Sequence, residues 1–208
     1  DHAERAIFDI SQHRIEGKFI RVGDIIKDSI EAIDQLYQRK EHVTGLATGF
    51  HEFDTKTAGL QRSDLIVIAG RPSMGKTALA TNIAFNAALT KAEKKTEGGV
   101  VALFSLEMSA DQLATRILAQ EAAISSDKIR RGELRSADFP KLIDISRRIS
   151  QIPLYIDDTP SLSISSLRTR ARRLKRQQGL DLIVIDYLQL MQAEGRSENR
   201  VQEVSQIT

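Results

Sequence analysis

A run of residues in the first half of the chain has the spacing of a phosphate-binding loop. Its sequence, Gly70-Arg71-Pro72-Ser73-Met74-Gly75-Lys76-Thr77, matches the pattern G-x-x-x-x-G-K-[ST] in full. The glycines let successive backbone N–H groups point at an anion, and a helix beginning there adds the positive end of its dipole. In such a loop Lys76 reaches the β- and γ-phosphates and Thr77 ligates Mg²⁺. The pattern therefore predicts an ATP and Mg²⁺ site; the alternative is an ordinary glycine turn between a strand and a helix.

An acidic residue after the last long apolar run is the predicted metal partner of this loop. Asp186 follows Leu182-Ile-Val-Ile185. A carboxylate at the end of a buried strand can hold Mg²⁺, usually through a bound water molecule. Asp157 and Asp158 end a shorter apolar run and are the rival pair for this role. The Thr159-Pro160 that follows them favours a strand-end turn, so the sequence favours Asp186.

Glu107 is the third acidic candidate, because it lies just beyond another apolar run. A carboxylate emerging from a strand beside the phosphate loop could polarise a water molecule for attack on the γ-phosphate. The alternative is a surface glutamate ahead of a helix, where the helix dipole favours a negative charge. The residues alone leave both interpretations open.

The second half of the chain also carries a basic cluster. No acidic residue lies between Asp158 and Asp181, and the cluster consists of Arg168, Arg170, Arg172, Arg173, Lys175 and Arg176. On a helix, Arg168 and Arg172 share a face away from the apolar stripe. This face is either solvated or subunit-facing, or it contacts nucleic acid; no aromatic residues for base stacking are interleaved.

These candidate residues need a scaffold of strands and helices, and the hydrophobic pattern predicts one. Short apolar runs alternate with longer helical segments, which indicates an α/β fold with a parallel sheet covered on both faces. The expected strands are 65–69, 100–105, 154–156 and 182–185. The expected helices are 76–92, 110–122, 139–150 and 164–178. Ser109 and Gln112 form a capping box, Ser163 can cap the last helix, and Gly179 suits its C-terminal end.

The beginning of the chain is different, with an amphipathic helix predicted at 24–40. Its single apolar stripe consists of Ile26, Ile30, Ile33 and Tyr37. Nothing else in this stretch can bury the stripe, so the helix must dock on something. The partner is either its own domain or a neighbouring subunit.

Composition bounds the remaining possibilities. The 208 residues include 41% hydrophobic and 28% charged side chains, typical of a globular chain, and the formal net charge is only +2. The absence of cysteine excludes disulfides, thiolate zinc sites and a cysteine nucleophile. No apolar run approaches the roughly 18 residues that cross a bilayer. The chain starts with Asp1 and without a signal pattern, so we expect a piece of a cytoplasmic protein.

Three motifs together resemble those of the bacterial replicative DNA helicases of the DnaB family. They are Gly70–Thr77, Phe104-Ser-Leu-Glu-Met108 and Leu182-Ile-Val-Ile-Asp-Tyr-Leu-Gln-Leu-Met191. Three further segments fit the same family: Thr44-Gly, Thr57-Ala-Gly-Leu60 and Arg168-Thr-Arg-Ala-Arg-Arg173. The resemblance implies a RecA-like P-loop NTPase core that assembles into a ring hexamer and translocates on single-stranded DNA using ATP. It also implies that Glu107 is the catalytic base.

The resemblance further divides the chain into parts and suggests partners. Residues 1–16 resemble the end of a helical N-terminal domain, 17–43 a linker whose helix packs on the adjacent subunit, and 44–208 the N-terminal part of the ATPase domain. Single-stranded DNA, a homo-hexamer, primase and a helicase loader are the implied partners. Residues 192–200 resemble a DNA-facing loop, with Arg196 and Arg200 as candidate contacts.

Other family features cannot be assigned to residues of this chain. In the family, a sensor strand ending in a glutamine lies between the phosphate-loop strand and the Asp186 strand, and an arginine finger comes later. We therefore expect a gap in the sheet. Two alternatives to a helicase remain open: a recombinase of the RecA or RadA type, and an assembly or partner-binding module that binds nucleotide without turning it over.

Overall fold

The computed structural model describes residues 21–23, 26, 30–31, 33–34, 43–93, 95 and 97–191. The chain divides into two compact units, Asp1–Glu41 and His42–Thr208. In the first unit the described residues from 22 to 34 are helical, in agreement with the predicted helix at 24–40. Ile26, Ile30 and Ile33 of its stripe are exposed, whereas Tyr37 and the predicted segment 1–16 lie outside the described residues.

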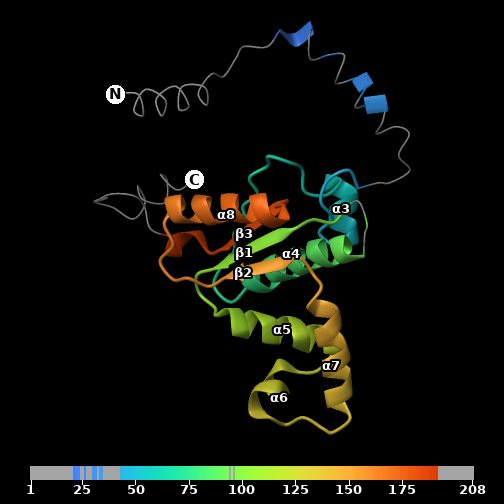
Figure 1. The fold of residues 1–208 in the computed structure, drawn as a ribbon, viewed down its shortest axis with the longest axis vertical. Helices are drawn as coiled ribbons and strands as arrows, with labels where there is room; N and C mark the ends of the chain where they lie inside the picture. Colours follow the sequence, from blue (N-terminus) through green and yellow to red (C-terminus); the bar gives the residue numbers. More distant parts are fainter. Residues whose placement is uncertain are drawn as a thin grey trace. The chain divides into compact units, whose positions relative to one another are not determined.

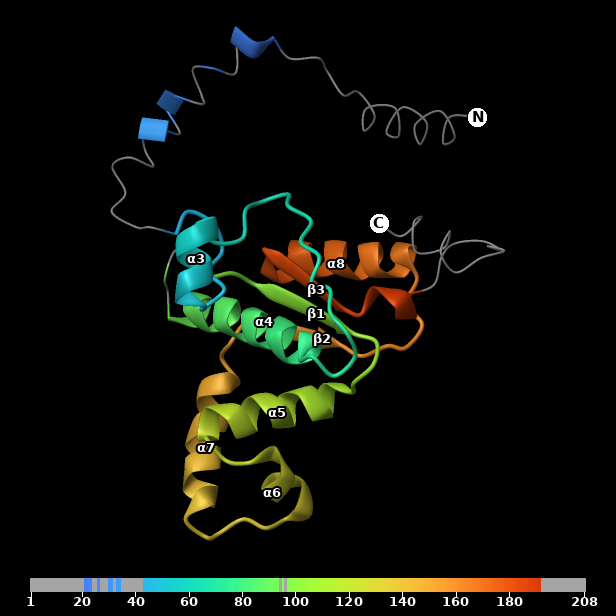
Figure 2. The same ribbon diagram turned by 180° about the vertical axis from the view of Figure 1, so that it is seen from behind.

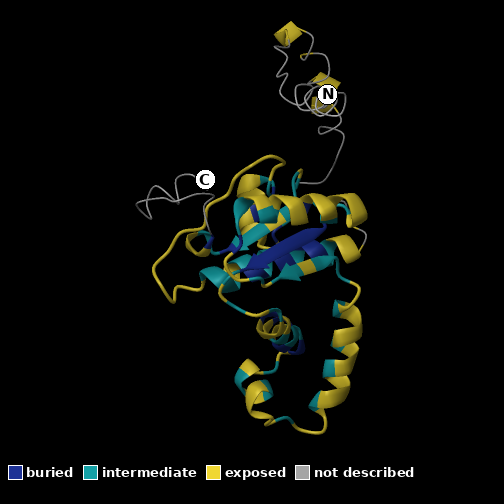
Figure 3. Ribbon diagram, turned by 60° about the vertical axis from the view of Figure 1, so that its left-hand side comes forward, coloured by how far each residue is buried: buried dark blue, intermediate teal, exposed yellow. Residues whose placement is uncertain are grey.

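The second unit is built on a parallel sheet of three strands in the order β2-β1-β3. The strands are β1 (Val101–Ser105), β2 (Leu154–Asp157) and β3 (Leu182–Asp186). The register aligns the first residue of β1 with the first residues of both neighbours and pairs Ser105 with Asp186. Every residue of the central strand β1 is buried (Figure 3). The predicted α/β class with a parallel central sheet is confirmed.

One long helix covers each face of this sheet (Figure 1): α4 (Lys76–Ala92) and α8 (Ile164–Gln178). Side chains alternate across β1, since successive residues of a strand point to opposite faces. Val101 packs against small alanines of α4, the fully buried Ala84, Ala87 and Ala88. Ala102 and Phe104 pack on the opposite side, with Leu162 and with Leu167 and Leu174 of α8.

The remaining helices are shorter or lie away from the sheet. They are α3 (His51–Thr57), α5 (Ala110–Ala122), α6 (Ser126–Arg131), α7 (Asp138–Ile149) and the 3₁₀ turn η1 (Leu188–Leu190). The capping box of Ser109 and Gln112 forms as predicted, and Ser163 accepts the backbone N–H of Ser166. Gly179 ends α8 with a φ of 83°. The helices α3 and α6 and the turn η1 were not predicted.

The predicted strand at 65–69 is wrong. The segment runs without regular structure, and its side chains are exposed, with Leu65 at 76% and Val67 at 72%. A strand is stable only when its backbone groups pair with a neighbour. No described strand lies beside this segment, and β3 has no second neighbour in the described part of the sheet. Because 65–69 forms no strand, the gap expected between it and the strand of Asp186 stays a prediction.

A buried carboxylate fastens the loop before this segment to the rest of the unit. Asp54 in α3 is only 5% exposed and accepts hydrogen bonds from the backbone N–H groups of Thr48 and Gly49 and from the Thr48 hydroxyl. Asn86 of α4 donates to the carbonyl oxygen of Thr48. Because Asn86 belongs to the helix that starts at the phosphate loop, this network ties residues 48–54 to that helix.

Candidate nucleotide site

The phosphate loop 70–77 leads directly into α4. Gly75 is the N-cap and has a φ of 82°, and nothing lies within 4 Å of where a Cβ would be. Glycine is favoured at this position by its backbone conformation rather than by lack of space. Gly70 to Gly75 are exposed, and Lys76 and Thr77 are partly buried. The first turn of α4 contains no acidic residue, which leaves the positive end of its dipole free of a local counter-charge.

Lys76 folds over the loop that precedes it. Its Nζ donates to the carbonyl oxygens of Gly70 at 3.0 Å and of Arg71 at 3.1 Å. The backbone N–H of Met74 also donates to the Arg71 oxygen, at 3.3 Å. The ammonium group of Lys76 is therefore held by carbonyl oxygens of its own loop. Its positive charge could also bind a phosphate at this place.

Asp186 is the last residue of β3 and is only 6% exposed. Its Oδ2 is buried and has no hydrogen-bond partner among the described residues. Burying a carboxylate oxygen without a hydrogen bond is unfavourable, and a hydrogen-bond donor or a cation beside the oxygen would offset this cost. The role of Asp186 as a metal partner of the loop stays a prediction, and a buried Oδ2 without a partner among these residues is compatible with it.

The rival carboxylates have other partners. Asp157, at the end of β2, accepts two hydrogen bonds from Nη1 of Arg170, at 2.6 and 2.8 Å, and one from the backbone N–H of Thr159. Burial raises the pKa of Asp157, but the bonds from Arg170 and Thr159 outweigh it and hold the pKa below its ordinary value. Asp158 accepts the backbone N–H of Ala110 at 2.8 Å. Asp157 thus ends β2 and Asp158 follows it, and both carboxylates are engaged by other groups of the chain.

Glu107 lies on the loop between β1 and α5. It is exposed and makes no hydrogen bond to any described residue, so its carboxylate is available. The loop itself is held firmly. The buried Ser105 hydroxyl donates to the carbonyl oxygen of Met108 at 2.7 Å, and the backbone N–H of Leu106 donates to the carbonyl oxygen of Asp186 at 2.8 Å. Ser105 was not singled out from the sequence, although it stands within the Phe104–Met108 motif.

The topology brings these groups to one edge of the sheet. Because the strands are parallel, Glu107, Asp157 and Asp186 all follow or end strands at the same carboxyl edge. Figure 2 shows that α4 runs back along the sheet, so its N-terminal end and the phosphate loop also lie at this edge. Ligands of open α/β sheets bind outside the carboxyl ends of the strands. The predicted nucleotide-binding and catalytic residues are thus grouped on one side of the unit.

The basic cluster of α8 is partly paired. Arg170 is held by Asp157, whereas Arg168 and Arg172 are exposed. Arg196 and Arg200 lie outside the described residues. Nothing in the sequence singled out Arg170 as the partner of Asp157, because the two lie on different elements.

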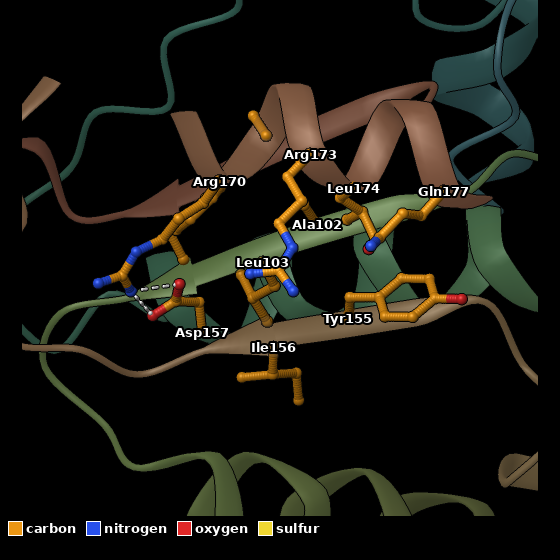
Figure 4. Close-up of a pocket in the computed structure, with 11 residues that line it drawn as sticks. Ala102, Leu103, Tyr155, Ile156, Asp157, Arg170, Arg173, Leu174 and Gln177 are labelled. Carbon is orange, nitrogen blue, oxygen red and sulfur yellow. Dashed lines mark hydrogen bonds and ion pairs between the residues drawn. The ribbon is translucent and has the colours of Figure 1, made fainter. Parts of the chain in front are cut away.

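A cavity of about 210 Å³ lies between α8 and β2 (Figure 4). Its lining includes Tyr155, Asp157, Arg170, Arg173, Leu174 and Gln177. No residue of the phosphate loop lines it, and neither does Glu107 or Asp186. The cavity is therefore separate from the predicted nucleotide site.

None of the described helices is long and apolar enough to cross a membrane.

Comparison with protein families gives a match over most of the chain. Residues 45–208 match the model of the DnaB-like helicase C terminal domain. The chain is 48% identical over 209 residues to the replicative DNA helicase DnaB of Geobacillus stearothermophilus and 46% identical over 207 residues to the replicative DNA helicase DnaC of Bacillus subtilis. These alignments cover 100% and 99% of this chain but 45% and 44% of the relatives, so the chain spans less than half of their length.

Solved structures agree with the fold. One of them, described as an ATPase domain, superposes with a TM-score of 0.79 at 31% identity, over 90% of this chain and 65% of that one. Another, described as a DnaB-like replicative helicase and its interactions with primase, gives a TM-score of 0.76 at 29% identity. That superposition covers 98% of this chain and 48% of the other. The relatives named here are helicases, which supports the helicase hypothesis over the recombinase alternative.

Proposed function

The chain belongs to the family of the DnaB-like helicase C-terminal domain, and from this membership we propose that the protein is an ATP-dependent replicative DNA helicase. In this proposal it translocates on single-stranded DNA and unwinds duplex DNA at the replication fork. The observation that carries the proposal is the family match over 45–208. Within this range the phosphate loop and the end of β3 lie at one edge of the sheet (Figure 2), and the buried Oδ2 of Asp186, at that strand end, has no hydrogen-bond partner among the described residues.

Residues 70–77 are proposed to bind ATP. The backbone N–H groups of the loop and the N-terminus of α4 would hold the phosphates, and Lys76 would leave its carbonyl partners to neutralise them. Thr77 and Asp186 would hold Mg²⁺, which when bound offsets the charge of the phosphates. The buried Oδ2 of Asp186, which has no hydrogen-bond partner in the part of the chain that the structure describes, fits this role through a water molecule.

Glu107 is proposed to be the catalytic base. A base has to approach the water that it deprotonates, and the carboxylate of Glu107 is exposed and has no hydrogen bond to another described residue. In the proposed reaction a carboxylate oxygen of Glu107 takes a proton from water as the water oxygen bonds to the γ-phosphorus. The bond from that phosphorus to the oxygen it shares with the β-phosphate breaks, and ADP and phosphate leave. Asp157 is less suited to this step because both of its carboxylate oxygens accept hydrogen bonds from Arg170, and its lowered pKa makes it a weaker base.

The proposed partners follow from the same family membership. Single-stranded DNA would contact the loop 192–200 through Arg196 and Arg200, with Arg168 and Arg172 as further candidates. The subunits would form a homo-hexamer through the helix at 24–40 and the ATPase surfaces, and the exposed stripe of Ile26, Ile30 and Ile33 supports this arrangement. Primase is a proposed partner because the description of a similar solved structure names it. A helicase loader is a further proposed partner, and the proposed location is the cytoplasm.

Steady-state ATPase and forked-DNA unwinding assays on the full-length protein would test the proposal. ATP-dependent unwinding that disappears in Lys76→Ala is the expected result. Strand exchange without unwinding would instead support the recombinase alternative, and nucleotide binding without turnover would support the non-catalytic module.

A second proposal concerns residues 1–208 by themselves: they should bind nucleotide weakly and fail to unwind DNA. The segment 65–69 before the phosphate loop is unpaired, and its Leu, Ile and Val side chains are exposed, which leaves the loop poorly anchored and favours aggregation. The same two assays, run on residues 1–208 beside the full-length protein, measure this. Comparable activity per site would show that the shorter chain already holds the complete motor.

A further inference from the structure

The loop that carries Glu107 is closed by one buried side chain. Ser105 is only 1% exposed, and its Oγ both donates to the carbonyl oxygen of Met108, at 2.7 Å, and accepts the backbone N–H of Met108, at 3.3 Å. Leu106 and Glu107 are the residues enclosed between these two ends. The hydroxyl thus fixes the distance between the end of β1 and the residue after Glu107.

The side of the loop nearest the sheet is fastened to β3. Ser105 is the register partner of Asp186, and one residue later the N–H of Leu106 donates to the carbonyl oxygen of Asp186 at 2.8 Å. This bond belongs to the backbone and is independent of side-chain identity. It places Glu107 one residue beyond a direct link to the proposed metal-binding aspartate.

The end of the loop that leads into α5 is held by the residue that follows β2. Asp158 follows the last residue of β2, and its Oδ2 accepts the N–H of Ala110 at 2.8 Å, at the first residue of α5. Ser109 and Gln112 complete this helix start with their capping box. The position of α5, and hence of the chain leaving Glu107, is therefore set partly by a carboxylate from a different strand.

We propose that Ser105 and Asp158 are positioning residues for Glu107. The inference rests on the proposed function, in which Glu107 is the base. Glu107 has no hydrogen bond of its own among the described residues, so its place is set by the backbone on either side of it. Ser105 holds that backbone from the strand end and Asp158 from the helix end. Displacing a catalytic group by about 1 Å can reduce the rate by roughly 100-fold, so small movements of this loop matter.

The first test replaces Ser105 in the full-length protein. Ser105→Ala removes both bonds to Met108 and should lower kcat for ATP by about 10- to 100-fold. The Kd for Mg·ADP should change by less than about threefold, because the phosphate loop lies on a different segment. Unchanged kcat in a variant with the same thermal midpoint as the parent would overturn the role of Ser105.

The second test uses a matched pair at Asp158. Asp158→Asn keeps a side-chain oxygen that can accept the Ala110 N–H, whereas Asp158→Ala has none. The expected result is near-parental kcat for the Asn variant and a reduced kcat for the Ala variant, with Mg·ADP affinity retained in both. Equal kcat in the two variants would overturn the role of Asp158. This pair keeps the proposal testable if Ser105→Ala does not fold.

A double variant separates positioning from general structural damage. Groups that act as one unit have non-additive effects on rate. Ser105→Ala should therefore lower the residual turnover of Glu107→Gln very little, measured with radiolabelled ATP, and a full additional loss would contradict the proposal. If Glu107→Gln alone keeps parental turnover, the proposed base is wrong. If Glu107→Gln is inactive and Ser105→Ala is fully active, only the positioning inference fails.

Discussion

The guanidinium of Arg170 in α8 holds the carboxylate of Asp157 at the end of β2, with Nη1 at 2.6 Å from Oδ2 and 2.8 Å from Oδ1. Nη1 also donates to the hydroxyl of Thr159 at 2.6 Å. The pair spans one side of the cavity between α8 and β2 (Figure 4) and ties the helix to the strand. Because both oxygens of Asp157 accept hydrogen bonds from Arg170, the pair favours Asp186 over Asp157 for the proposed metal site.

This pair predicts a pH dependence of stability. The pKa of Asp157 is depressed in the folded protein, so the pair's contribution is complete above the ordinary aspartate pKa of about 3.9. The contribution is lost as the pH falls through the lower folded-state pKa. Arg170→Met should raise the pKa of Asp157 in a carboxyl NMR titration. Because Arg170 is 42% exposed, the cost in stability at neutral pH should be only about 0.2–1 kcal/mol.

Arg168→Met is the matched control for that experiment, since Arg168 is an exposed arginine on the same helix. It should leave the pKa of Asp157 unchanged. An equal shift in both variants would show that the general charge of α8, rather than the bond from Arg170, lowers the pKa.

Removing the amine of Lys76 should stop ATP turnover. Lys76→Ala in the full-length protein takes away the charge that offsets the phosphates, and losing such an electrostatic group costs about 10²- to 10³-fold in rate. Steady-state phosphate release measures the change. Lys91→Ala, at the other end of α4, is the control and should keep parental activity. Normal ATPase activity in Lys76→Ala would rule out the assignment of the loop.

Glu107→Gln should separate binding from hydrolysis. The amide keeps the size of the side chain but cannot take a proton, so nucleotide affinity should persist while turnover stops. Equilibrium binding of Mg·ADP and single-turnover hydrolysis report the two quantities. Glu133→Gln, an exposed glutamate after α6, should change neither. A parallel fall in affinity and turnover would make Glu107 a binding or folding residue instead.

The helix at 24–40 is predicted to be an assembly element. Ile26, Ile30 and Ile33 are 50%, 60% and 64% exposed. Burying a large apolar side chain contributes roughly 1.5–3 kcal/mol, which could drive docking on a partner. Ile30→Asp in the full-length protein should shift a size-exclusion profile from a ring to smaller species. Glu31→Gln, at the next position, should leave the ring intact, and an unchanged hexamer peak for Ile30→Asp would count against the prediction.

Asp54→Ala should loosen the segment before the phosphate loop. The substitution leaves the N–H groups of the buried Thr48 and the exposed Gly49 without their acceptor, at a cost of about 1–3 kcal/mol for the buried group. The thermal midpoint should fall, and amide hydrogen exchange at residues 48–54 should become faster. Glu52→Ala, an exposed residue of the same helix, is the control and should show neither effect. Unaltered exchange in Asp54→Ala would show that the network contributes little.

Much of the fold could be predicted because its signals are local. The predicted bounds of α4, α5 and α8 match the structure at both ends, since helix starts and stops depend on nearby caps such as Ser109, Ser163 and Gly179. The helices α3 and α6 were missed because seven and six residues are too few to show a periodic pattern.

The sequence by itself determined the α/β class, and it predicted the phosphate loop and the preference for Asp186 over Asp157, since each depends on residue types at short spacing. Tertiary structure decided what depends on partners distant in the chain. The segment 65–69 has the composition of a strand but forms none, because a strand needs a neighbour to pair with. The bond from Arg170 to Asp157 and the bond from Ala110 to Asp158 join separate elements at the carboxyl edge of the sheet. At the same edge, Oδ2 of Asp186 has no hydrogen-bond partner among the described residues. Side-chain contacts between elements depend on register and packing, which local sequence patterns do not encode.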